Sequence, residues 1–248
     1  MSNGAATLFV TGTDTGVGKT VVTAALARCL RQRGYQVGVM KPIETGVPAH
    51  RPAEPDRSDA NRLRRAAASS DDWALINPYR FAAPLAPVDA ARMEGQVVTL
   101  QPIREAFQTL KQRHQILLVE GAGGLLVPIS EDRDMSDLIR ELACAVLVVG
   151  RVSLGGFNHA RLTLESLARR TLPVLALVLN QIREASDEEE EGQQRSTARL
   201  LRERSRVPVL GPLPVERRLN ADWDAGIEQL SAHPVIEELA RLLAPPPA

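Results

Sequence analysis

The stretch GTDTGVGKT at residues 12–20 nearly fits the phosphate-binding pattern G-x-x-x-x-G-K-[ST]. Its end matches at Gly18, Lys19 and Thr20, but the first glycine is Gly12, one residue earlier than the pattern requires. An apolar run precedes the stretch and an amphipathic segment follows it, which is the context that a phosphate loop needs. The sequence therefore predicts a phosphate-binding loop with one extra residue, rather than an ordinary glycine-rich turn.

The residue types of this stretch suit a nucleoside triphosphate. Backbone N–H groups around Gly16 and Gly18 can converge on phosphate oxygens, at the positive end of the following helix. Lys19 is expected to reach the β and γ phosphates, and the hydroxyl of Thr20 to hold Mg²⁺. We also expect Lys19 to face solvent and to pack little. ATP and Mg²⁺ are thus the predicted ligands, although nothing in the loop excludes CTP or GTP.

Charged residues end two other apolar runs. Lys41 follows the run at 36–40, and Glu120 ends the run at 115–120, just before the glycine-rich stretch GAGG. Because ligands of doubly wound sheets lie beyond the carboxyl ends of the strands, we expect Lys41 near the γ phosphate and Glu120 beside Mg²⁺. Alone, such a lysine is more often a surface charge, and such a glutamate a helix-capping or salt-bridged residue. The neighbouring phosphate loop favours the functional interpretation.

Short apolar runs alternate with segments of helical period along the whole chain. The runs lie at 7–11, 36–40, 115–120, 145–150, 174–180 and 207–213. Helices are expected at 18–33, 58–68, 102–114, 136–143, 156–170, 193–204 and 234–243. Because the runs are almost continuously apolar, both faces of each strand should be buried. The sequence predicts an α/β fold: one domain over residues 1–248, with a mostly parallel, doubly wound sheet and helices on both faces.

Composition argues against several classes of function. Lys+Arg and Asp+Glu balance at 30 each, so no long-range field favours nucleic acid or an anionic membrane. The chain has no run of 18 apolar residues and no basic N-terminal leader, so we expect no membrane association and a cytoplasmic location. Cys29 and Cys144 lack metal-ligand spacing and should be structural.

Three polar or proline-rich segments are expected outside the core. The segment 44–57 is predicted to be mobile until a ligand binds, and the tail 244–248 to be frayed. The acidic run DEEEE at 187–191 is either a docking site or, the favoured interpretation, a solvated turn that leads into a helix.

Taken together, the motifs GTDTGVGKT, KPIETG, RSDANRL, NPYRF, VEGAGGLLVPI, LGGFNHARLT and LVLNQI resemble the dethiobiotin synthetase family, which has the P-loop NTPase fold. The phosphate loop of that family carries the same additional residue. The resemblance implies an ATP-dependent reaction of 7,8-diaminononanoate with CO₂ or bicarbonate in biotin biosynthesis. A carbamate and its mixed anhydride with phosphate would precede closure of the cyclic urea.

The resemblance also implies a role for each matching residue. Lys19, Lys41 and Thr45 would be catalytic, and Thr20, Asp59 and Glu120 would hold Mg²⁺. Nucleotide contacts would come from Thr13, Asp14, Thr15, Gly16, Val17, Gly18, Lys19, Thr20, Asn180, Pro214 and Val215. Substrate contacts would come from Thr45, Gly123, Gly155, Gly156, Phe157 and Asn158. In the family, LGGFN receives the substrate carboxylate across a dimer interface, so a homodimer is expected.

Three other functions remain possible. An ATP-driven switch, as in the partition and septum-site ATPases, would carry a signature lysine in the loop, where this chain has Asp14. Another ATP-dependent carboxylate-activating ligase, of the cobalamin-pathway amidotransferase kind, would usually add a glutaminase domain with a nucleophilic cysteine. A degenerate nucleotide-binding module would lack Lys41, Asp59 or Glu120, and all of them are present.

Overall fold

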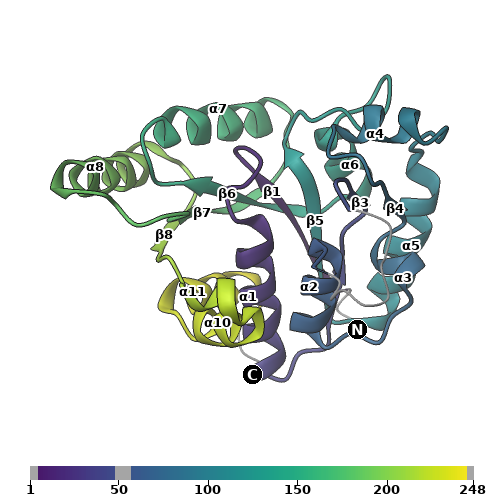
Figure 1. The fold of residues 1–248 in the computed structure, drawn as a ribbon, viewed down its shortest axis with the longest axis horizontal. Helices are drawn as coiled ribbons and strands as arrows, with labels where there is room; N and C mark the ends of the chain where they lie inside the picture. The colour runs from purple at the N-terminus through teal and green to yellow at the C-terminus, as the bar shows by residue number, and fades with distance from the viewer. Residues whose placement is uncertain (1–4, 48–56, 245–248) are drawn as a thin grey trace.

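The computed structural model describes residues 5–47 and 57–244, which form an α/β fold around a parallel sheet (Figure 1). The sheet has six strands in the order β2-β5-β1-β6-β7-β8, and each neighbouring pair runs parallel. These strands are β1 (Ala6–Gly12), β2 (Val37–Met40), β5 (Ile116–Gly124), β6 (Ala145–Arg151), β7 (Val174–Asn180) and β8 (Val209–Leu213). The predicted parallel, doubly wound sheet is confirmed.

Helices cover both faces of the sheet, as Figure 1 shows. The longer ones are α1 (Lys19–Gln32), α2 (Asp59–Ala67), α5 (Leu100–Arg113), α6 (Met135–Leu142), α7 (Gly156–Arg169), α8 (Glu188–Arg204), α10 (Trp223–Ser231) and α11 (Pro234–Leu243). The short ones are α3 (Trp73–Ile76), α4 (Pro87–Met93) and α9 (Arg218–Ala221). A second, two-stranded sheet pairs β3 (Ile43–Glu44) with β4 (Tyr79–Arg80).

Alternate residues of each strand supply two separate apolar cores. On β1, Leu8 and Val10 pack with α1, α2, α10 and α11, whereas Phe9 points to the opposite face. That second core contains Phe107 of α5 and Leu167 of α7. Because both faces are covered, the strands read as unbroken apolar runs, and the site can form only at the strand ends.

The structure differs from the sequence prediction at several short elements. The helices α3, α4, α9 and α10 and the strands β3 and β4 were not expected. Helix α8 begins at Glu188, because Asp187 caps it by accepting from the Glu190 N–H, so the acidic run is its first turn. The prediction of a frayed tail is wrong at Ala244, which is buried against the core; residues 245–248 lie outside the described part.

The predicted mobile segment is only partly described. Glu44 is buried in β3, so the prediction was wrong there, while residues 48–56 lie outside the described ranges. No helix within 5–47 and 57–244 has the length and apolar character that a membrane crossing needs.

Candidate functional site

The loop between β1 and α1 closes tightly around the ammonium group of Lys19. Its Nζ donates to the carbonyl oxygen of Asp14 at 3.2 Å, inside the turn of the loop. A Cβ atom on Gly12 would lie 2.7 Å from that carbonyl oxygen and 3.1 Å from the Lys19 Nζ. The folded loop therefore leaves no room for a side chain at Gly12, the glycine that lies one residue earlier than the usual pattern requires.

Asn180 at the end of β7 holds the other side of the loop. Its Nδ2 donates to the carbonyl oxygen of Val17 at 3.0 Å, and the residue is buried. Gly18 has a φ of +94°, and a Cβ there would lie 2.1 Å from the same Nδ2. Gly18 is thus required both by its left-handed conformation and by the contact with Asn180. Asn180 supports the loop in this structure, and its contact with a base stays a prediction.

Lys19 is buried, so the expectation that it faces solvent and packs little is wrong. It is 7% exposed, because it begins α1 under the loop instead of projecting from it. Burial, together with the nearby charge of Lys41, lowers the pKa of Lys19 to about 8. The helix starts at Gly18 with no side-chain cap, so its first-turn N–H groups remain available to a phosphate.

Lys41 lies directly after β2 and joins two carboxylates, the buried Glu120 and the half-buried Asp59. Its Nζ lies 2.5 Å from Glu120 Oε1 and 3.1 Å from Asp59 Oδ2. The Thr20 hydroxyl donates to the same Glu120 oxygen at 2.8 Å. Strands β2 and β5 are neighbours with Met40 opposite Val119, and this register brings Lys41 beside Glu120. Contrary to expectation, β5 does not end at Glu120 but continues through Gly124.

The charges of this network shift the ionisation of its members. Burial alone would lower the pKa of Lys41, but the carboxylates of Glu120 and Asp59 outweigh it and hold that pKa above its ordinary value. Burial would likewise raise the pKa of Asp59, yet the Lys41 ammonium and its hydrogen bond keep it low. Both groups are therefore charged at neutral pH.

The donor set at this point suits Mg²⁺. Glu120 is fully buried, and its Oε2 has no hydrogen-bond partner among the described residues. The carboxylate of Asp59 and the hydroxyl of Thr20 lie within the same network. The described ranges contain no cluster of three or more His, Cys, Asp or Glu residues with metal-site geometry. Mg²⁺ usually binds through one or two carboxylates with waters and phosphate oxygens, so these residues fit it.

Glu44, which the sequence analysis did not assign, fixes the position of Asp59. Its carboxylate accepts from the backbone N–H of Asp59 at 2.5 Å and from that of Ala60 at 3.2 Å. It therefore caps the start of α2 together with Ser58, whose hydroxyl accepts from the Asn61 N–H. Burial raises the pKa of Glu44. The sequence signal for this role is that Glu44, an acidic residue, lies three positions after Lys41.

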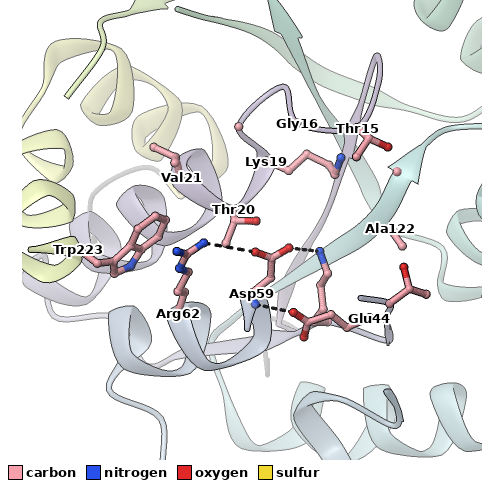
Figure 2. Close-up of a pocket in the computed structure, with 14 residues that line it drawn as sticks. Thr15, Gly16, Lys19, Thr20, Val21, Glu44, Asp59, Arg62, Ala122 and Trp223 are labelled. Carbon is pink, nitrogen blue, oxygen red and sulfur yellow. Dashed lines mark hydrogen bonds and ion pairs between the residues drawn. The ribbon is translucent and has the colours of Figure 1, made fainter. Parts of the chain in front are cut away.

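A cavity of about 320 Å³ opens beside these groups (Figure 2). Its lining contains the predicted Thr15, Gly16, Gly18, Lys19, Thr20, Lys41, Thr45, Asp59 and Gly123. It also contains Val21, Glu44, Arg62, Ala122 and Trp223, which were not predicted. Gly123 has a φ of +63°, and a Cβ there would lie 2.7 Å from Val127, so this backbone can approach a ligand closely.

The remaining nucleotide residues lie outside this cavity. Pro214 and Val215 line a second cavity of about 470 Å³, with Gln181, Glu184 and Arg195. Thr13 has a buried Oγ1 without a hydrogen-bond partner in the described part of the chain. Asp14 is exposed, and its Oδ1 accepts from the Thr15 N–H at 2.7 Å.

The LGGFN segment lies at the start of α7 and away from the cavity of about 320 Å³, whose lining includes none of its residues. Gly155 is left-handed, with a φ of +81°, and a Cβ on Gly156 would lie 2.1 Å from the Arg151 carbonyl oxygen. Phe157 packs partly against the core, while Leu154 and Asn158 are exposed. The segment thus forms a helix start without a side-chain cap, at which Leu154, Gly155 and Asn158 are exposed.

Comparison with known proteins identifies the family of this chain. A family model described as an AAA domain matches residues 6–222. The ATP-dependent dethiobiotin synthetase BioD of Anaeromyxobacter sp. (strain Fw109-5) is 48% identical over 180 residues, 73% of this chain and 78% of that protein. The BioD of Thermodesulfovibrio yellowstonii is 38% identical over 221 residues, 86% of this chain and 90% of that protein.

Solved structures agree on the fold. The MinD cell division protein of Aquifex aeolicus superposes with a TM-score of 0.58 at 15% identity, over 96% of this chain and 95% of that chain. At this identity the likeness concerns the fold alone. The BioD proteins are similar over most of both lengths, and the family suggested by the motifs is confirmed. The chain belongs to the dethiobiotin synthetase family.

Proposed function

We propose that this protein forms dethiobiotin from 7,8-diaminononanoate, CO₂ and ATP. One observation carries the proposal: Lys19 and Lys41 line one cavity, and the Lys41 Nζ lies 3.1 Å from Asp59 and 2.5 Å from Glu120. Cations and carboxylates at this distance, beside a phosphate loop, suit transfer of a phosphoryl group to an anionic acceptor.

The reaction proceeds through three steps. One amine of the diamine attacks CO₂, forms an N–C bond and loses a proton, which gives a carbamate. A carbamate oxygen then attacks the γ phosphorus of ATP, and the bond from phosphorus to the ADP oxygen breaks. Finally the second amine attacks the carbonyl carbon, loses its proton and expels phosphate, which closes the cyclic urea. Phosphorylation is needed because a carbamate oxygen is otherwise a poor leaving group.

The protein contributes position and charge to these steps. Lys19 binds the β and γ phosphates, and Lys41 stabilises charge that develops on the γ phosphoryl group and the carbamate. Thr45 offers its hydroxyl to the reacting amine, and the Gly123 backbone lies against the substrate. Thr20, Asp59 and Glu120 would hold Mg²⁺, which would supply positive charge to the phosphate oxygens.

The nucleotide base is assigned to the second cavity. Asn180 lies opposite Leu213 where β7 ends, and Gln181, which follows it, lines this cavity together with Pro214 and Val215. Thr13, Asp14, Thr15, Gly16, Val17 and Gly18 surround the phosphates with backbone groups. The free, buried thiols of Cys29 and Cys144 accord with a reducing compartment, so we place the enzyme in the cytoplasm.

The functional unit is proposed to be a homodimer. Gly155, Gly156, Phe157 and Asn158 do not line their own chain's cavity, so they would receive the substrate carboxylate in the partner's site. The exposed Leu154, of which 77% is accessible, supplies apolar surface next to this segment.

An ATP-driven switch is the main rival function, because this fold also occurs in MinD. The decisive assay measures ADP release with diaminononanoate and bicarbonate together, and with each omitted, while mass spectrometry follows dethiobiotin. A synthetase releases ADP in step with product and only when both are present. ADP release that is independent of both substrates, without product, would overturn the proposal in favour of a switch.

The shared site is tested by mixing two impaired variants, Lys41→Ala and Asn158→Asp. In randomly mixed dimers, half are heterodimers, and each has one intact site, so about a quarter of wild-type activity should return. Mixed dimers that form but recover no activity would place the whole site within one chain.

A further inference from the structure

Arg62 lies on the cavity wall and rests on an aromatic ring from a distant part of the chain. It follows Asp59 by three residues on α2, and its Cζ lies 4.2 Å from the centre of the Trp223 ring on α10. Figure 2 shows the guanidinium between Trp223 and Asp59, beside Thr20 and Val21. A cation over an indole face is favoured electrostatically, so Trp223 fixes where the guanidinium lies.

Among the described residues, the guanidinium has little else to neutralise it. Its described ion pair, from Nη1 to Asp59 Oδ1, is long at 3.9 Å, and the side chain remains 33% exposed. Lys41, in contrast, is saturated by the Asp59 and Glu120 carboxylates. Arg62 is therefore a cation that faces the cavity with donors to spare.

The position of Arg62 indicates which phosphates of a bound nucleotide it would contact. It lies at the Thr20–Val21 end in Figure 2 and pairs with Asp59 Oδ1, whereas Lys41 pairs with Asp59 Oδ2 and also donates to Gly121 O at 3.4 Å. In a phosphate loop, the backbone N–H groups surround the α and β phosphates and the lysine reaches toward γ. Arg62 thus lies nearer the non-reacting phosphates than the reacting group, and a planar guanidinium suits two phosphate oxygens at once.

We propose that Arg62, held in place by Trp223, binds the non-reacting phosphates of the nucleotide and so sets its affinity. The inference rests on the nucleotide site of the proposed function. It gives α10 a role in the site, since removal of its ring would leave Arg62 unrestrained. Because the contact is the same before and during phosphoryl transfer, it should change KM for ATP and leave kcat nearly unchanged.

The alternative is that Arg62 only joins α2 to α10. A second pair, Arg65 with Asp224, already links these helices. If Arg62 had only this structural role, its replacement would change thermal stability and leave nucleotide binding unchanged. The chain also offers a matched control in Arg64, which lies on the same helix with its Cζ 5.1 Å from the centre of the Trp73 ring. Neither Arg64 nor Trp73 lines the cavity.

The test compares Arg62→Ala, Arg62→Lys and Arg64→Ala in the full-length enzyme. The dissociation constant of ADP with Mg²⁺ is measured by calorimetry, KM and kcat are measured for ATP, and melting temperature reports stability. We expect Arg62→Ala to weaken ADP binding roughly 10- to 100-fold, with kcat nearly unchanged, and Arg64→Ala to bind ADP normally. Arg62→Lys, which keeps the charge without the planar fork, should weaken binding several-fold at an unchanged melting temperature.

The outcomes separate this inference from the proposed function. Normal ADP binding by both Arg62 variants, beside a Lys19→Ala variant that binds none, would overturn the role of Arg62 alone. Normal ADP binding by Lys19→Ala would overturn the nucleotide site itself. Should Arg62→Ala fail to fold, Arg62→Lys decides, and an unchanged ADP affinity there refutes the contact.

Discussion

Lys41 and Glu120 form a buried ion pair across the carboxyl edge of two neighbouring parallel strands, with Nζ and Oε1 2.5 Å apart. Their side chains are 4% and 0% exposed, so water screens this pair weakly. The ammonium therefore lies among the oxygens assigned to Mg²⁺. Loss of either partner leaves a buried charge without its counterion, which affects both stability and catalysis.

Replacement of Lys41 should separate its effect on catalysis from its effect on stability. Lys41→Ala should lower kcat by about 10²- to 10³-fold with little change in KM for ATP, because the lost charge interaction develops during transfer. It should also lower the free energy of unfolding by about 3–5 kcal/mol, and Mg²⁺ should restore part of that loss. Steady-state kinetics and urea unfolding measure both, with Lys111→Ala on α5 as the control lysine. An unchanged kcat would remove Lys41 from the mechanism.

Glu120 should govern metal binding. Glu120→Gln keeps the shape of the side chain but removes the charge of a carboxylate whose Oε2 has no described partner. Mn²⁺ binding to the ADP-bound enzyme, followed by electron paramagnetic resonance, should weaken about tenfold or more, since hard cations prefer charged oxygen ligands. Mn²⁺ affinity equal to that of the wild type would exclude Glu120 as a ligand.

Gly18 should tolerate no side chain, for two separable reasons. Gly18→Ala combines a left-handed φ of +94° with a Cβ 2.1 Å from Asn180 Nδ2, so ATP turnover should be lost. Gly34→Ala is the matched control, because its φ is +88° and a Cβ there meets nothing within 4 Å. Thermal unfolding should show a cost of about 1–2 kcal/mol for Gly34→Ala and more for Gly18→Ala. Equal costs would contradict the clash with Asn180.

The ionisation of Asp71 should make the free energy of unfolding depend on pH. Burial alone would raise its pKa, but hydrogen bonds from Ser69 and His114, at 2.7 Å each, and from Arg113 at 3.2 Å outweigh it, so its folded pKa lies below the ordinary value of about 3.9. The stability contributed is present above that ordinary value and is lost as pH falls through the folded pKa.

The replacement Asp71→Asn tests this directly. At pH 7 it should lower the free energy of unfolding by about 1–3 kcal/mol, and the difference from wild type should shrink as the pH falls below 4. Urea unfolding at several pH values measures it. A constant difference between pH 7 and pH 3 would show that the ionised carboxylate contributes nothing.

Local sequence patterns predict much of the candidate site. Lys19 and Thr20 follow from the loop pattern, and Lys41 and Glu120 follow because parallel strands bring their carboxyl ends to one edge. The exposure of Lys19 was mispredicted, because the pattern says nothing of how tightly a loop folds over its own lysine. Glu44 was missed for the same reason, since only the folded turn brings it to the start of α2.

Arg62 and Trp223 illustrate what local patterns cannot supply. They are separated by most of the chain and meet only because α10 packs against α1 next to α2. Helix α10 itself did have a signal: Asp222 caps it, and Trp223, Ile227 and Leu230 recur at helical spacing. Its shortness and internal Gly226 concealed that spacing.

The strand order β2-β5-β1 has a consequence during synthesis on the ribosome. Strand β5 inserts between two strands that are made much earlier, and it carries Glu120. The phosphate loop emerges roughly 100 residues before this strand, which at usual elongation rates is roughly 5 to 20 seconds. Throughout that interval the nascent chain has its glycine loop, Lys41 and Asp59 but not Glu120, the nearer acidic partner of Lys41, so a prematurely terminated product that lacks β5 cannot complete the site.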